Sequence, residues 1–134
     1  MAWLTIEHIR LFAPCEQIEM VAHMFPGGFE VTADNARRLS SAGVNIWWAV
    51  HMLGVDGQNG LIERSVGRTG MERLDGALLS RCISEAVEAA SRGGKEQPSG
   101  LYAYRWLARA RTSEQEAELQ LVDLVKALND HFTG

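Results

Sequence analysis

Histidines, cysteines and carboxylates are the side chains with which this chain could catalyse a reaction or bind a metal. The histidines are His8, His23, His51 and His131, and none of them has the HxxxH or HExxH spacing of a metal site. Cys15 and Cys82 are isolated and do not form a CxxC pair. Glu19 and His23 lie four residues apart, a spacing that usually only stabilises a helix. We therefore predict no catalytic residue, no metal site and no cofactor, so a small-molecule enzyme is the least favoured class of function.

Two glycine-containing segments were candidates for binding phosphate or another anion. Neither the PGG at 26–28 nor the segment 54–70 has the spacing of a P-loop or of a dinucleotide-binding turn. Within the second segment, GRTG at 67–70 precedes an expected helix, and a helix N-terminus can hold an anion. The basic residues around it are Arg64, Arg68 and Arg73. These three are candidate partner-binding residues, and the alternative interpretation is a solvated loop.

The segment LYAYRWLARAR at 101–111 interleaves aromatic and basic residues. Trp, Tyr and Arg are the residues enriched at hot spots of protein interfaces. Tyr102 and Trp106, at i and i+4, would form an outer aromatic pair beside Arg105 and Arg109. These four are therefore candidate contact residues.

A second interpretation of this segment stays open. Leu101, Tyr104, Leu107 and Ala108 would then face the core. The arginines would pair with the segment 112–134, which carries five acidic residues and one lysine.

The neighbouring residues Trp47 and Trp48 pose a similar question. They lie in Ile46–Leu53, a segment that is apolar nearly all round, and such a helix is usually buried. Adjacent residues cannot both face inward on one helix, so we expect one of the two tryptophans to be exposed or to meet a partner chain.

These candidates must be positioned by helices, because apolar residues recur at helical spacing along most of the chain. We predict one all-α domain over 1–134, with six or seven short-to-medium helices and a long Gly-containing loop at about 55–70. It divides into an N-terminal helical module at 1–54 and C-terminal helices at 71–134. The expected N-caps are Thr5, Thr32, Asn45, Ser99 and Ser113. Pro14 should begin the second helix, Gly43 should end the third, and Phe29–Val31 should be extended.

The strongest helix signal is expected over Met71–Arg92, with a buried stripe of Leu74, Leu78, Cys82 or Ile83, Ala86, Val87 and Ala90. The last two helices should cover Leu101–Arg111 and the residues after Ser113. The final helix should bury Leu121, Leu124, Val125, Leu128 and Phe132.

Composition bears on location and partners. No charged and apolar leader pattern opens the sequence, and no apolar run approaches the ~20 residues of a membrane span. Two isolated thiols fit a reducing compartment. The net charge of −4 disfavours direct binding of nucleic acid. Eleven of the thirteen basic residues are Arg, which suggests a GC-rich bacterial or phage genome. We expect a protein of the bacterial cytoplasm that binds no membrane.

The N-terminal module also carries a resemblance, on Cys15, Ile18, Phe25-Pro26, Gly28, Val31-Thr32, Asn35, Ala42-Gly43, Trp47/Trp48 and Leu53. This run resembles a module in small uncharacterised accessory proteins of phages and other bacterial mobile elements. It departs from that pattern at Gln17, since the family more often has its Gln one place later. The resemblance implies a small accessory protein and assigns no catalytic residues.

Two classes of function follow. The first is a non-enzymatic protein that binds another protein, such as an anti-CRISPR-like inhibitor that binds a CRISPR effector subunit of the host. An acidic protein can block a basic nucleic-acid channel by charge complementarity. The second is a homodimeric structural or regulatory protein that pairs through Ile46–Leu53 and Leu101–Leu107.

Overall fold

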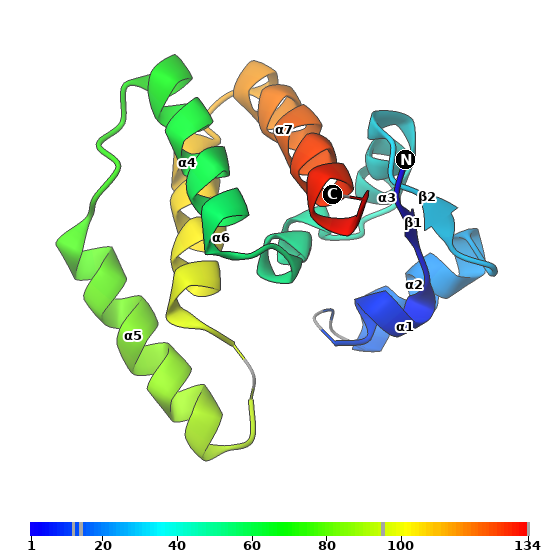
Figure 1. Ribbon diagram of the computed structural model, residues 1–134, viewed down its shortest axis with the longest axis horizontal. Helices are drawn as coiled ribbons and strands as arrows, with labels where there is room; N and C mark the ends of the chain where they lie inside the picture. The colour runs from blue at the N-terminus through cyan, green and yellow to red at the C-terminus, as the bar shows by residue number, and fades with distance from the viewer. Residues whose placement is uncertain (12, 14, 95, 134) are drawn as a thin grey trace.

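The computed structural model describes residues 1–11, 13, 15–94 and 96–133. These residues form seven α-helices, one 3-10 helix and a two-stranded sheet (Figure 1). The elements are β1 (Trp3–Leu4), α1 (Ile6–Ile9), α2 (Cys15–Met24), β2 (Phe29–Glu30), α3 (Ala33–Ser41), η1 (Ile46–Met52), α4 (Val55–Thr69), α5 (Gly76–Ser91), α6 (Pro98–Ala110) and α7 (Glu114–Thr133). The all-α prediction is confirmed, and the prediction for Pro14 concerns a residue outside the described ones.

The two short strands are antiparallel and are held to the last helix. Trp3 pairs with Glu30, and Leu4 pairs with Phe29. Asn129 of α7 accepts a hydrogen bond from the Ala2 amide at 2.6 Å and donates one to the Val31 carbonyl at 3.0 Å. One side chain near the end of the chain therefore connects both strands of the sheet.

Local capping signals set the limits of α3 and η1 as predicted. The Thr32 side chain accepts a hydrogen bond from the Asn35 amide, and Gly43 follows α3 at a φ of +96°, which favours glycine. Asn45 caps η1 by accepting from the Trp47 amide at 3.1 Å. The helix η1 is a 3-10 helix, and five of its apolar residues are buried: Ile46, Trp48, Ala49, Val50 and Met52.

The loop predicted at about 55–70 is wrong, because Val55–Thr69 is an α-helix. Its buried face consists of Gln58, Leu61, Ile62 and Ser65 at i, i+3, i+4 and i+7. Each glycine costs a helix about 1 kcal/mol relative to alanine, whereas burying one Leu or Ile contributes roughly 1.5–3 kcal/mol. Packing against α6 and α7 therefore outweighs the poor helix propensity.

The start of α5 is five residues later than predicted, at Gly76 instead of Met71. The backbone before it is used by α6: the Tyr102 hydroxyl donates to the Arg73 carbonyl at 2.7 Å, and Trp106 Nε1 donates to the Glu72 carbonyl at 3.0 Å. Side chains of α6 thus bind these two carbonyls, which are not part of a helix. Asp75 is the N-cap of α5, and its side chain accepts a hydrogen bond from the Leu78 amide.

The start of α6 also differs from the prediction, because the N-cap is Gln97 and not Ser99. Pro98 takes the first helical position, where its missing N–H is not needed. The cap of α7 is confirmed at Ser113, whose hydroxyl accepts from the Glu116 amide at 3.1 Å. The Glu116 side chain does not complete a capping box, because it turns into the core instead.

The helix α6 lies at the centre of the packing. It contacts α4, α5 and η1, and α7 packs against α4 and α3. One continuous cluster of buried apolar residues has members in both 1–54 and 71–134. In the final helix, Leu121, Leu124 and Leu128 are buried as predicted, whereas Phe132 is exposed.

Candidate functional site: the outer side of α5 and an arginine groove

The helix α5 is covered mainly from one side. It lies at the outer edge of the molecule and packs mainly against α6 (Figure 1). Leu78, Cys82 and Ala86 are buried against that helix. Of the predicted alternatives Cys82 and Ile83, Cys82 is the buried one and Ile83 is 46% exposed, whereas Val87, predicted to be buried, is 65% exposed. A partly covered helix thus leaves apolar side chains in solvent, which is a common feature of interaction sites.

Leu74 adds to this exposed apolar surface just before the helix begins. The sequence predicted it to be buried, but its exposed fraction is 68%. The reason is the late start of α5: position 74 lies in the non-helical segment and is not on the helical face that Leu78 shares.

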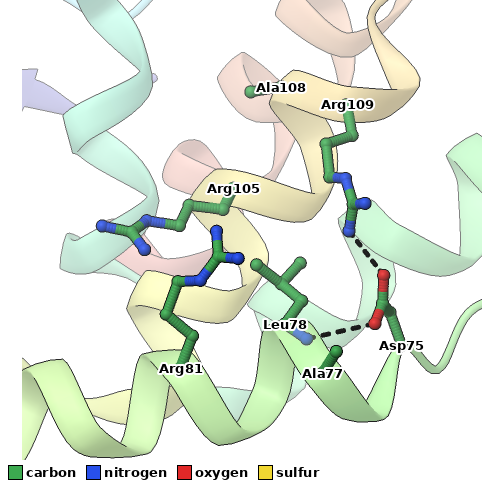
Figure 2. Close-up of a pocket in the computed structure, with 7 residues that line it drawn as sticks. All are labelled: Asp75, Ala77, Leu78, Arg81, Arg105, Ala108 and Arg109. Atoms are coloured by element: carbon green, nitrogen blue, oxygen red, sulfur yellow. Dashed lines mark hydrogen bonds and ion pairs between the residues drawn. The ribbon is translucent and has the colours of Figure 1, made fainter.

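A groove of about 410 Å³ runs between α5 and α6 beside this helix (Figure 2). Arg81 of α5 and Arg105 and Arg109 of α6 extend along it, together with Asp75. Arg105 and Arg109 come together because they lie four residues apart, one turn along α6. The candidates Arg105 and Arg109 therefore share one surface, and α5 contributes the third arginine.

Two of the three arginines have carboxylate partners across the groove. Arg109 contacts Asp75 at 2.5 Å, and Arg105 contacts Glu85 at 2.5 Å. The hydrogen bond from the Leu78 amide and that from Arg109 lower the pKa of Asp75, so it is charged at neutral pH. Arg81 makes no ion pair with a described residue within 4.0 Å. The groove consequently keeps an excess of positive charge on an otherwise acidic protein.

The acidic final helix is not the partner of these arginines, as one interpretation of the sequence had proposed. Both ion pairs run to α5 or its cap. Arg111, in contrast, does contact α7, where its Nη1 donates to Gln120 Oε1 at 2.9 Å.

Tyr102 and Trp106 do not form an outer aromatic pair. Their exposed fractions are 9% and 1%, and both polar atoms bond backbone groups of the segment before α5. The alternative interpretation is also only partly right, since Leu107 is buried but Ala108 is exposed. The side of α6 that is buried is rotated about the helix axis, by about one residue position, from the side that the sequence predicted to face the core. The reason is that α4 and α5 both pack on α6.

The predicted basic spot around GRTG is not a free cluster of charge. Arg68 forms ion pairs with Glu116 at 2.7 Å and Asp123 at 2.9 Å, and Arg73 contacts Glu63 at 3.7 Å. The segment 67–70 is the end of α4 and not the start of a helix, so it lacks the free amides of an anion site. Arg64 remains on the surface and makes no ion pair with a described residue within 4.0 Å.

The two tryptophans of η1 point in different directions, as expected. Trp48 is buried in the core, and Trp47 is half-buried. The guanidinium of Arg111 lies 4.1 Å from the centre of the Trp47 ring, a cation–π contact. A residue of this chain therefore covers the side chain for which a partner was considered.

Histidines and cysteines do not gather into a reactive cluster in the part of the chain that the structure describes. No group of three or more His, Cys, Asp or Glu side chains could hold a metal ion there. Burial raises the pKa of the Cys82 thiol, which makes it a poor nucleophile at neutral pH.

Sequence reasoning missed Arg81, Ile83 and Val87 as surface residues. Their helical spacing indicates a two-sided helix, but periodicity alone does not say how much of the apolar side a neighbour covers.

In the described ranges, no helix combines the length and the apolar character needed to cross a membrane. Comparison with protein-family models, with curated proteins and with solved structures found no match to this chain.

Proposed function

We propose that this chain is a non-enzymatic protein that acts by binding another protein, and that α5 is its contact surface. The observation that carries the proposal is the exposure of Ile83 and Val87 on α5, a helix covered mainly from one side, together with the exposed Leu74 just before it. Singly exposed apolar residues are normal on a protein surface. Here, however, Ile83 and Val87 lie on the same helix that forms one wall of the arginine groove.

The groove defines the chemistry of the partner. Arg81 carries a charge that no described side chain neutralises, and it lies on the same helix as Ile83 and Val87. Residues two apart on a helix do not face the same side, so the matching partner presents a carboxylate on the groove side of α5 and an apolar side chain on the side of Ile83 and Val87. The carboxylate would pair with Arg81, since Arg binds carboxylates through parallel N–H donors.

A finer proposal concerns the identity of the partner. The resemblance of residues 15–53 to accessory proteins of mobile elements supports an inhibitor of a host defence complex, with a CRISPR effector subunit as the partner. This part rests on the resemblance alone, and so do the phage origin and the bacterial cytoplasm.

The test uses purified CRISPR effector subunits, gel filtration with this protein and a target-cleavage assay. We expect co-elution and inhibition, both lost in the Val87→Glu and Arg81→Glu variants. Val122→Glu is the matched control, because Val122 is a similarly exposed valine on α7. The absence of a complex with every effector would refute the proposed partner class. A complex that survives both α5 variants would refute α5 as its contact surface.

The alternative, a homodimer through Ile46–Leu53 and Leu101–Leu107, loses most of its proposed contact surface. The apolar residues of η1 are largely buried, as are Tyr102, Trp106 and Leu107. A dimer would have to form elsewhere on the molecule, for example through the exposed apolar residues of α5. Light scattering over a dilution series separates this alternative from a monomeric binder: a mass that falls on dilution indicates self-association.

A further inference from the structure

A separate cavity lies where η1, the start of α4 and the start of α6 meet. It has a volume of about 480 Å³, within the roughly 300–1,000 Å³ typical of small-molecule sites. The side chains that matter for its chemistry are Trp48, His51, Gln58, Glu96 and Tyr104, and the backbone of Gly100 completes the wall. None of these residues belongs to the α5 surface.

Gly100 allows this wall to form. It is buried on α6, and a methyl group there would lie 2.7 Å from His51 Nδ1 and 3.4 Å from Gln58 Nε2. Heavy atoms do not approach that closely, so any side chain would displace the imidazole. The cavity in this form therefore requires glycine at this position.

Three ring systems line the space. The rings of His51 and Tyr104 are stacked, with centroids 5.8 Å apart and an angle of 23° between planes. The Tyr104 hydroxyl accepts a hydrogen bond from Asn45 Nδ2 at 2.6 Å, which fixes the orientation of the ring. Trp48 supplies the third ring. Aromatic faces of this kind attract apolar groups and cations alike.

Two of the lining residues each carry a buried polar atom that has no hydrogen-bond partner among the described residues. The Gln58 carboxamide uses Nε2 to donate to the Val50 carbonyl at 3.2 Å and the Leu53 carbonyl at 3.0 Å, which leaves Oε1 without a donor. The indole Nε1 of Trp48 is likewise unpaired. Buried polar groups are nearly always satisfied in native proteins, so two exceptions among the residues that line one cavity are unusual.

The charge of the wall is negative. Glu96 is the one residue with a formal charge among the described residues that line the cavity. Burial lowers the pKa of His51 and outweighs the opposing effect of Glu96, so the imidazole is neutral at pH 7. Among the described lining residues, an anionic ligand would meet a carboxylate and no positively charged side chain.

From these observations we propose that the cavity binds a small organic cation, an amine on an aromatic or apolar body. The body packs against the rings of Trp48, His51 and Tyr104. The ammonium group pairs with the Glu96 carboxylate. A free amine and the lysine side chain of another protein share the ammonium group, but the aromatic wall favours a ligand with its own ring, and therefore the free aromatic amine.

The test is NMR titration of the full-length protein with phenethylamine as the probe. We expect saturable shifts of the Trp48 indole N–H and of the Gly54 and Gly100 amides. 3-Phenylpropionate has a similar body and the opposite charge, and it should bind at least tenfold more weakly. N-acetyl-lysine methylamide carries the same ammonium group without a ring, and it should also bind more weakly than phenethylamine.

Three variants sharpen the result. Glu96→Gln should weaken phenethylamine binding about tenfold, the usual effect of losing one charge-assisted contact, and should remove the preference over 3-phenylpropionate. Glu88→Gln, on the exposed side of α5, is the matched control and should change nothing. Gly54→Ala adds a methyl group at a wall position with no heavy atom within 4 Å, so it should weaken binding without unfolding the protein.

The proposal is overturned if phenethylamine gives no saturable shift, or if its shifts map to the α5–α6 groove. It is also overturned if phenethylamine and 3-phenylpropionate bind equally well, or if Glu96→Gln has no effect on the binding of phenethylamine. Equal binding of the lysine amide would overturn the free aromatic amine as the ligand and point to a lysine-bearing protein.

Discussion

The ion pair between Arg68 and Glu116 is buried deeply enough to make a quantitative prediction. The exposed fractions of the two side chains are 26% and 6%. Arg68 donates to both carboxylate oxygens of Glu116, at 2.7 and 2.9 Å, and the Ser65 hydroxyl donates to Oε2 at 2.6 Å. Burial alone would raise the pKa of Glu116, but the hydrogen bonds from Arg68 and Ser65 outweigh it and lower the pKa.

The perturbation is Arg68→Met, which removes the cation and keeps much of the aliphatic bulk. Glu116 would then be a buried carboxylate with one strong donor left, and breaking such a pair typically costs 3–5 kcal/mol. Protonation of Glu116 limits this cost. At pH 7 the limit is about 3.4 kcal/mol, from the 2.5 units between the ordinary pKa of 4.5 and pH 7 at 1.36 kcal/mol per unit. At pH 5 the same limit falls to about 0.7 kcal/mol.

Urea unfolding of wild type and Arg68→Met at both pH values measures this difference. We expect a loss of about 3 kcal/mol at pH 7 and at most about 0.7 kcal/mol at pH 5. Arg37→Met is the control, because Arg37 pairs with Glu118 on the surface, where solvent screens the ion pair, and at pH 7 it should cost much less than Arg68→Met. An equal loss for Arg68→Met at both pH values would refute the reasoning. So would a loss at pH 7 that is smaller for Arg68→Met than for Arg37→Met.

Three further predictions concern α4, α5 and η1, each measured as the free energy of unfolding in urea. Gly67→Ala should stabilise the protein by about 0.5–1 kcal/mol, because the added methyl meets no heavy atom within 4 Å on a regular helix; a loss would show that α4 needs this glycine. Asp75→Ala should destabilise the protein by removing the acceptor for the Leu78 amide at the N-cap, whereas Asp75→Asn should recover much of the loss. Burial lowers the pKa of His51 below its ordinary 6.5, so the unfolded chain binds this proton more tightly and stability falls as the pH drops below about 6.5. That component of the pH dependence should disappear in His51→Gln and persist in His23→Gln, since His23 is exposed.

Helix limits were predictable where a local side chain determines them. Thr32, Asn45 and Ser113 each accept a hydrogen bond from a backbone amide two or three residues later, so the signal and its effect lie within one turn. The left-handed Gly43 is a signal of the same kind. Interactions of this range do not depend on the rest of the fold.

The helix α4 was not predictable in the same way, because its stability comes from distant residues. Two of the four residues on its buried face, Gln58 and Ser65, are polar. They can be buried because Gln58 donates hydrogen bonds to the Val50 and Leu53 carbonyls and Ser65 donates one to Glu116. A pattern of apolar residues does not reveal such partners. The four glycines of 54–67 then dominated the interpretation of this segment as a loop.

The candidate surface was predictable only in part, for a related reason. Arg105 and Arg109 stand out in the sequence because they alternate with aromatic residues. Which of these residues face solvent depends on how α4 and α5 pack on α6, and that packing joins residues more than thirty positions apart, as in the contact of Arg109 with Asp75. Arg81 became part of the groove through the same packing.

The link that Asn129 makes between Ala2 and Val31 constrains how this protein can fold during synthesis. A ribosome releases the first strands long before residue 129 has left the exit tunnel. Until then the amide of Ala2 and the carbonyl of Val31 lack their partner, and β1 and β2 lack the helix that anchors them. The N-terminal module should therefore reach its final arrangement only after residue 129 has left the exit tunnel, and a chain truncated before Asn129 should remain sensitive to protease at its N-terminus.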